Sequence, residues 1–174
     1  MENGSFPDAE APPPPTGTVV RPAQESDVDA IVRVHGDSIR VLCRERYGER
    51  EIAAWIAFRP PEAYRSAFAS RELFVAERRG EVVGFGQLNP RRGEIEACYV
   101  APDAVGAGVG AALLQRMEAE AGRRGHAVVH LNATLNAESF YQRMGYRRVG
   151  PARHRVADDV NLECVRMKRV LRSR

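Results

Sequence analysis

The first regular pattern in the chain is an apolar stripe with spacings of three and four within residues 25–48. Its members are Val28, Ile31, Val32, His35, Ile39 and Leu42. This period predicts an amphipathic helix. The same reasoning predicts helices over 49–58, which must end before Pro60, over about 108–124, and over 136–145.

Strands are predicted where apolar and polar residues alternate or apolar runs are short. A first strand ends at Pro22, and a hairpin over 72–90 surrounds the turn sequence RRGE. Further strands are predicted over 94–100, 126–133, 146–150 and 161–171. The order β, α, α, β, β, β, α, β, α, β, β predicts an α/β domain with a mixed sheet and helices packed on it.

The first 16 residues differ in composition from the rest of the chain. They are acidic and rich in proline, and no basic stretch followed by an apolar run occurs there. We therefore expect a disordered tail over 1–16 instead of a secretory signal, and a single domain over 17–174. No apolar run approaches the roughly 18 residues of a membrane span, so no membrane partner is expected.

Cysteine count and charge narrow the function classes further. The three cysteines, Cys43, Cys98 and Cys164, are widely spaced, which favours a reducing, cytoplasmic location over a disulfide framework or a zinc cluster. The tail holds three of the 23 acidic residues and none of the 26 basic ones, so the rest carries about +6. This surplus suits a small anionic ligand. The basic residues are scattered, so no nucleic-acid partner is expected.

The segment AVGAGVGAALLQRME, residues 104–118, places Gly106, Gly108 and Gly110 where a helix is predicted to begin. Glycine lets backbone N–H groups approach a ligand, and the first turn of a helix leaves its N–H groups unpaired. The segment therefore predicts an anion site, most often for phosphate. It is not a P-loop, because no Lys-Ser/Thr follows, and its spacing is not the dinucleotide fingerprint.

Two motifs in order carry a resemblance to a known family. They are YVAPDAVGAGVG, across the predicted strand, loop and helix, and NAESFYQRMGY, which follows further along the chain. Together they resemble the GNAT superfamily of N-acetyltransferases, over roughly residues 18–171 and most closely over 94–150. The stretch SIRVLCRERYGEREIAAWI also looks like the substrate-side helices of a bacterial branch. The resemblance implies a central, mostly antiparallel sheet that is splayed at the cofactor site and flanked by helices.

The resemblance also implies an activity. It implies transfer of an acetyl group from acetyl-CoA to a primary amine of a small molecule or peptide, by direct attack in a ternary complex. A monomer or homodimer and no metal are expected. An alternative is a non-catalytic acetyl-CoA-binding module, a sensor or scaffold, because Val105 and Ala107 replace the polar or basic residues common in this loop.

Three residues are candidates for catalysis. The resemblance places a general base on the strand over 94–100, where Glu94 matches better than Glu96. Alternation puts both carboxylates on one side unless a bulge intervenes, and neighbouring carboxylates tend to raise one pKa, which suits a base near neutral pH. The alternative is that both are solvated surface charges. The resemblance implies that Tyr141 protonates the leaving thiolate, and packing is the alternative role.

The implied cofactor contacts are largely main-chain contacts. The backbone of Cys98, Tyr99 and Val100 would pair with the pantetheine amides, and Asn136 would cap the last helix and bond the pantetheine arm. The implied phosphate loop consists of Val105, Gly106, Ala107, Gly108, Val109, Gly110 and Ala111. Cys98 could instead be an acyl-accepting nucleophile, but no histidine follows nearby to activate it, so a small buried side chain is favoured.

The acceptor pocket would be roofed by the helices over 25–48 and 49–58. Arg40 is the candidate for binding a carboxylate-bearing acceptor. Trp55 is a second lining candidate, although a large aromatic residue at this spacing is a core residue by default.

Overall fold

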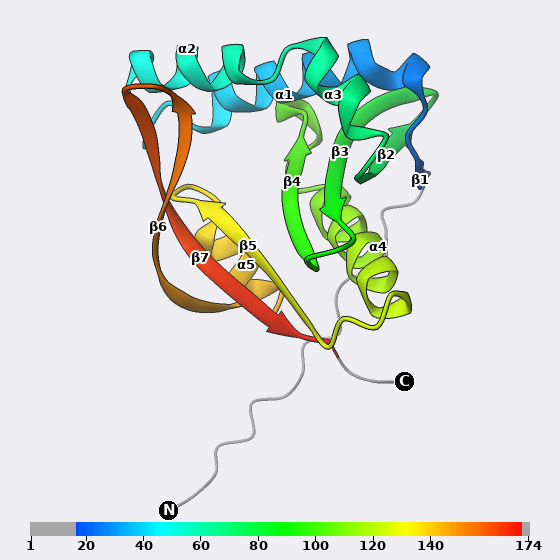
Figure 1. The fold of residues 1–174 in the computed structure, drawn as a ribbon. Helices are drawn as coiled ribbons and strands as arrows, with labels where there is room; N and C mark the ends of the chain where they lie inside the picture. The colour runs from blue at the N-terminus through cyan, green and yellow to red at the C-terminus, as the bar shows by residue number, and fades with distance from the viewer. Residues whose placement is uncertain (1–16, 172–174) are drawn as a thin grey trace, which may run out of the picture.

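A seven-stranded sheet with the order β1-β2-β3-β4-β5-β7-β6 runs through the protein (Figure 1). The computed structural model describes residues 17–171, so the tail predicted over 1–16 lies outside the described residues. The strands are β1 Thr18–Pro22, β2 Glu72–Arg78, β3 Glu81–Asn89, β4 Glu94–Val100, β5 Val128–Thr134, β6 Arg147–Ala157 and β7 Val160–Val170. The α-helices are α1 Val28–Leu42, α2 Glu49–Phe58, α3 Pro61–Ala67, α4 Val109–Arg123 and α5 Glu138–Arg143.

The sheet is antiparallel everywhere except between β4 and β5. These two parallel strands pair only at Glu94 with His130 and at Ile95 with Leu131. Beyond those pairs they diverge, and Figure 1 shows the resulting V-shaped gap between green β4 and yellow β5. The predicted mixed, mostly antiparallel and splayed sheet is confirmed.

Helices cover the two faces of the sheet unequally. Helices α1, α2 and α3 lie together along one end of the sheet (top in Figure 1), and α4 and α5 pack on the face of the sheet opposite to theirs. The largest core cluster lies beneath α4 and α5 and includes Leu88, Leu113, Met117, Leu131 and Met167. A second lies beneath α1 and α3, and a third joins α1 and α2 to the β6–β7 hairpin. The burial of apolar side chains in these clusters stabilises the arrangement.

Two elements differ from the sequence prediction. Helix α3 was not expected, because it is only seven residues long and begins at Pro61, the second of the two prolines that follow α2. Strand β6 extends to Ala157 and not to residue 150, although it contains Pro151 and many polar residues. It is an edge strand, so it tolerates a proline, and most of its side chains are exposed and carry no apolar period. No helix within residues 17–171 is long and apolar enough to cross a membrane.

Candidate active site

A β-bulge in β4 sets the direction of the candidate base residues. Ile95 and Ala97 pair with consecutive residues of β3, so Glu96 is the extra residue between them. Ile95 packs in the core beneath α4, whereas Glu94, Glu96 and Tyr99 line a cavity on the other face. A bulge is therefore present in this strand, and the carboxylates of Glu94 and Glu96 nevertheless lie on the same side of the sheet.

The cavity has a volume of about 440 Å³ and lies between α2, α3, β4 and the β5–β7–β6 part of the sheet. Its walls combine aromatic and polar groups, which is typical of small-molecule sites. The polar and charged side chains include Arg59, Arg71, Gln87, Arg92, Glu94, Glu96, Asn132 and His154. Trp55 is buried at 3% exposure, as a core residue is, and it also lines this cavity.

Glu96 is held by three donors. Its Oε2 accepts hydrogen bonds of 2.6 Å from both Arg71 Nε and Gln87 Nε2, and its Oε1 accepts one of 3.1 Å from Asn89. Burial raises the pKa of Glu96, but these hydrogen bonds together outweigh burial, so the pKa lies below its ordinary value. Glu96 is therefore not a carboxyl group with a raised pKa, and it is an anion at neutral pH.

Glu94 has fewer partners than Glu96. Its Oε2 lies 3.3 Å from Arg92 Nε and 3.8 Å from His130 Nε2. Burial lowers the pKa of His130, with Glu94 opposing it, so the imidazole is neutral at pH 7 and Arg92 is the ionic partner. Within residues 17–171, no donor bonds Glu94 Oε1, and the side chain is 16% exposed. Glu94 therefore has a carboxylate oxygen available to a ligand in the cavity.

Tyr141 lies on α5, on the other face of β4 from the two carboxylates. It is buried beside Phe140 and Tyr146, with ring centroids 5.0 and 5.6 Å away. Its hydroxyl makes no hydrogen bond with the part of the chain that the structure describes. Burial raises its pKa well above the ordinary value, and the neighbouring Cys98 and Tyr99 of β4 add to this. The phenol is thus a protonated donor that faces β4.

The edge of β4 next to the gap has free backbone groups. Cys98, Tyr99 and Val100 pair with β3 on one side, whereas pairing with β5 stops at Ile95. The Cys98 sulfur lies 3.8 Å from the Gly110 carbonyl, and burial raises the pKa of this thiol to about 12. A protonated thiol is a poor nucleophile, so the geometry favours the packing role of Cys98.

The glycine loop has the form that an anion site requires. Gly106 and Gly108 have φ of +82° and +78°, where glycine is favoured, and Val105 is 55% exposed. The first helical hydrogen bond of α4 joins Ala112 N–H to Gly108 O at 3.0 Å. The preceding backbone N–H groups that bond no carbonyl or side chain of residues 17–171 are those of Gly106, Gly108, Val109, Gly110 and Ala111.

Gly110 also has a packing role that the sequence did not indicate. It has ordinary helical φ, and a Cβ there would lie 3.2 Å from Phe140 Cζ. Its missing side chain therefore allows α4 to pack against α5. Val109 and Ala111 beside it are buried, at 1% and 5% exposure, and Ala107 is partly buried against the core beneath α4. Only the backbone of these residues is available to a ligand.

Two other candidates lie elsewhere than expected. Asn136 is exposed in the turn before α5, which begins at Glu138 after Ala137, so Asn136 is not the N-cap. Arg40 is exposed on α1, 3.3 Å from Asp37, and does not line the cavity. The periodicity of α1 could place Arg40 on a helix but could not show which surface that helix turns to the cavity.

Sequence similarity identifies the family. The acetyltransferase (GNAT) domain matches residues 43–170, more than half of the chain. The chain belongs to the GNAT family of acetyltransferases. The expected family, fold and class of enzyme are thereby confirmed. No curated protein sequence matches the chain.

Solved structures share the fold of this acetyltransferase. A GCN5-related N-acetyltransferase of Rhodopseudomonas palustris is 26% identical with a TM-score of 0.84, over 90% of this chain and 98% of that one. The PaiA N-acetyltransferase of Thermoplasma acidophilum, in complex with coenzyme A, is 17% identical with a TM-score of 0.75, over 88% and 99%. YncA of Salmonella typhimurium, with acetyl-CoA, is 20% identical with a TM-score of 0.61, over 91% and 96%.

Several polar residues of the acetyltransferase cavity were not singled out from the sequence. Arg71 and Asn89 bind Glu96 from segments that carry no motif. Gln87 gave a usable signal, because it is a polar residue within the apolar β3 run and is only 2% exposed. Arg59 lies between the end of α2 and two prolines, where nothing in the pattern marks it. Within residues 17–171, no cluster of His, Cys, Asp and Glu has the form of a metal site.

Proposed function

We propose that this acetyltransferase transfers the acetyl group of acetyl-CoA to a primary amine, by direct attack while both substrates are bound. The observation that carries the proposal is the placement of groups around the gap between β4 and β5. The glycine loop and Tyr141 lie on one face of β4, and the cavity with Glu94 and Glu96 lies on the other. Acetyl-CoA, the acetyl donor, and the amine, the acetyl acceptor, can therefore approach the gap from opposite faces of the sheet.

The residues on the face of β4 that carries the glycine loop and Tyr141 fit coenzyme A. The unpaired N–H groups at the start of α4 suit a pyrophosphate, and the free edge of β4 suits the amides of the pantetheine arm. Val105 and Ala107 contribute no charge, so main-chain donors would provide the binding. When bound, acetyl-CoA supplies a thioester whose carbonyl carbon bonds to the amine nitrogen as the carbon–sulfur bond breaks.

Glu94 is the proposed general base. A primary amine with an ordinary pKa near 10.4 is mostly protonated at neutral pH, so the attacking nitrogen must first lose a proton. Glu94 has a carboxylate oxygen that receives no donor from residues 17–171, whereas both oxygens of Glu96 are engaged. Glu96 would instead hold the incoming ammonium group by its fixed negative charge. The Tyr141 hydroxyl would protonate the departing sulfur from the other face.

A thiol-release assay over a panel of primary amines tests the proposal. We expect intersecting initial-velocity lines, because both substrates bind before transfer, and parallel lines would contradict direct attack. Glu94→Gln should lower kcat by about 10- to 1000-fold, the usual contribution of one general base. Glu96→Gln should act mainly on KM. Binding of acetyl-CoA without turnover of any amine would instead favour a sensor or scaffold.

A further inference from the structure

Arg59 is an unpaired cation in the wall of the cavity. It follows directly after α2 and is partly buried. The two other arginines there are neutralised, since Arg71 bonds Glu96 at 2.6 Å and Arg92 lies 3.3 Å from Glu94. Arg59 forms neither an ion pair nor a hydrogen bond with any residue from 17 to 171. A guanidinium in such a place retains its full capacity to bind an anion.

The positive charge of Arg59 affects neighbouring side chains inside the protein. The guanidinium carbon lies 5.4 Å from the Phe58 ring centroid, and that ring lies 5.4 Å from the ring of His154. Contact with an aromatic face leaves the N–H groups of a guanidinium free. The positive charge also contributes to lowering the pKa of His35 on α1 and of His154 on β6, after burial. Arg59 is therefore directed between α1 and β6 and not only toward solvent.

Gln87 provides an independent sign that a ligand group belongs in the same place. The side chain is 2% exposed, and its Nε2 donates to Glu96. Because this bond fixes the orientation of the amide, Oε1 is the remaining acceptor, and it is buried without a donor from residues 17–171. An unpaired buried carbonyl is costly, so a donor on the ligand would stabilise it. Gln87 and Glu96 thus mark a place for an N–H group.

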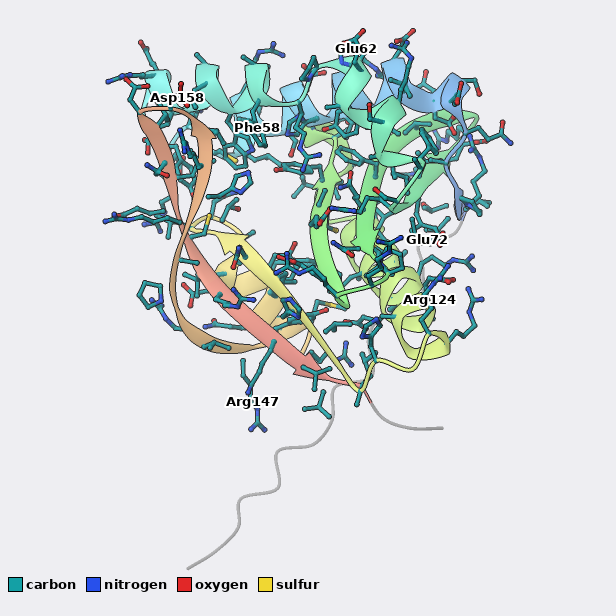
Figure 2. The ribbon with its side chains drawn as sticks, viewed as in Figure 1. Phe58, Glu62, Glu72, Arg124, Arg147 and Asp158 are labelled. Carbon is teal, nitrogen blue, oxygen red and sulfur yellow. The ribbon has the colours of Figure 1, made fainter. Side chains whose placement is uncertain are left out.

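The sheet surface that leads away from the cavity is basic. Arg166 pairs with Asn132 of the cavity wall, and Lys168 pairs with both His130 and Arg147, so these side chains share one face. All three cations are exposed, and none forms an ion pair within residues 17–171. Figure 1 shows no helix over this face of β5 and β7 below α2. Figure 2 shows the side chain of Arg147 pointing away from the sheet into solvent. Such a surface attracts anionic ligands.

We infer that the acceptor is a small amine that also carries a carboxylate, of the amino-acid class, and that Arg59 binds this carboxylate. The inference rests on the proposed function. The ammonium group would lie against Gln87, Glu94 and Glu96, and the carboxylate against Arg59 in the same cavity of about 440 Å³. A cavity of this size is typical of small-molecule sites. The basic face would draw an amino acid with a net negative charge to the opening.

Matched pairs of acceptors test the inference. The probes are the L-amino acids and their α-carboxamides, assayed with acetyl-CoA, because the amide lacks the negative charge. The amide also has the less basic amine, which loses its proton more easily, so this difference acts against the expected preference. We expect kcat/KM for the best acid to exceed that of its amide at least tenfold. Arg59→Gln should abolish this preference through KM and leave the amide unchanged, and Arg59→Lys should retain part of it. Arg44→Gln removes an exposed arginine after α1 and should leave both substrates unchanged.

A second readout separates this inference from the proposed function. The melting temperature measured with each amino acid alone, without acetyl-CoA, reports binding whether or not transfer occurs. A rise in the wild type that is lost in Arg59→Gln supports the carboxylate site even if no amine is acetylated. Equal use of acids and amides, or a preference unchanged in folded Arg59→Gln, would overturn it. Faster acetylation of an acidic peptide than of any free amino acid would also overturn it.

Discussion

The hydroxyl of Tyr47 accepts a hydrogen bond of 3.0 Å from the backbone N–H of Leu135. The same hydroxyl donates one of 2.6 Å to the carbonyl of Glu163 on β7. Tyr47 lies between α1 and α2 and is 5% exposed, so one buried phenol ties the helices over the cavity to the end of β5. This is where β5 has already separated from β4 and lacks that strand as a support.

Tyr47→Phe should lower the free energy of unfolding by about 1–3 kcal/mol, because it leaves the partly buried N–H of Leu135 and carbonyl of Glu163 without this partner. Urea denaturation would measure the loss. Tyr64→Phe is the matched control, since Tyr64 is equally buried and its hydroxyl makes no hydrogen bond within the described chain. Equal losses in the two variants would show that the Tyr47 bonds contribute nothing specific.

The fold could be predicted where the spacing of apolar residues along the sequence matches the buried face of a helix or strand. The stripe on α1 is visible in the sequence, because this helix buries one face. The length of β6 could not be predicted, since this edge strand is held by β7 and exposes most of its side chains. The splay was implied by the family resemblance alone, because the loss of pairing after Ile95 has no local signal.

The site was predictable from motifs but not from single residues. The loop around Gly108 and the strand with Glu94 follow from sequence order. The donors on Glu96 come from positions 7 to 25 residues away along the chain, so the sequence could not show that its pKa is lowered. Arg59 illustrates the same limit, because only the tertiary structure shows that an arginine after α2 lines the cavity while Arg40 does not.

Gly106→Ala should weaken binding of coenzyme A by tenfold or more, about 1.4 kcal/mol. An L-residue is strained at φ of +82°, so the loop would shift and its N–H groups would lose their common direction. Calorimetry with coenzyme A measures the change. Gly125→Ala is the control, because its φ is +87° and it also has open space at Cβ, but it follows the other end of α4. Equal weakening in both variants would exclude a phosphate role for the loop.

His35 predicts a pH dependence of stability. Burial, with a smaller contribution from Arg59, lowers its pKa to about 3, whereas an unfolded histidine has a pKa of about 6.5. Between these values the unfolded state binds the proton, so stability falls as the pH falls, by about 2 kcal/mol from pH 7 to pH 5. His35→Phe should retain the edge contacts with Tyr64 and Tyr99 and remove this part of the dependence.

Urea denaturation of wild type and His35→Phe at both pH values would measure this difference. His130 and His154 also have pKa values lowered chiefly by burial, so they contribute with the same sign in both proteins. The comparison therefore isolates His35. If the two proteins lose the same free energy between pH 7 and pH 5, His35 is not held neutral in the folded state.

Tyr141→Phe should lower the rate of acetyl transfer without lowering affinity for acetyl-CoA. The Tyr141 hydroxyl bonds nothing in residues 17–171, and the ring packs against Phe140 and Tyr146, so the variant should fold with little loss of stability. If the hydroxyl protonates the leaving sulfur, its effect belongs to the transition state, and kcat should fall roughly 10- to 1000-fold. The dissociation constant should change less than about threefold, or roughly 0.7 kcal/mol.

The pH profile tests whether Tyr141 stays protonated as a donor, and the size of the rate difference separates this role from a packing role. Because burial raises the pKa of Tyr141 above its ordinary value of 10, the donor stays protonated throughout the neutral and mildly alkaline range. The rate of the wild type should therefore show no loss from ionisation of this group below about pH 10, and the ratio of wild-type to variant rates should be constant there. Pre-steady-state measurement must show that chemistry limits turnover. If Tyr141→Phe then transfers acetyl groups as fast as the wild type, water or a backbone donor protonates the sulfur, and Tyr141 only fills the space between α5 and β4.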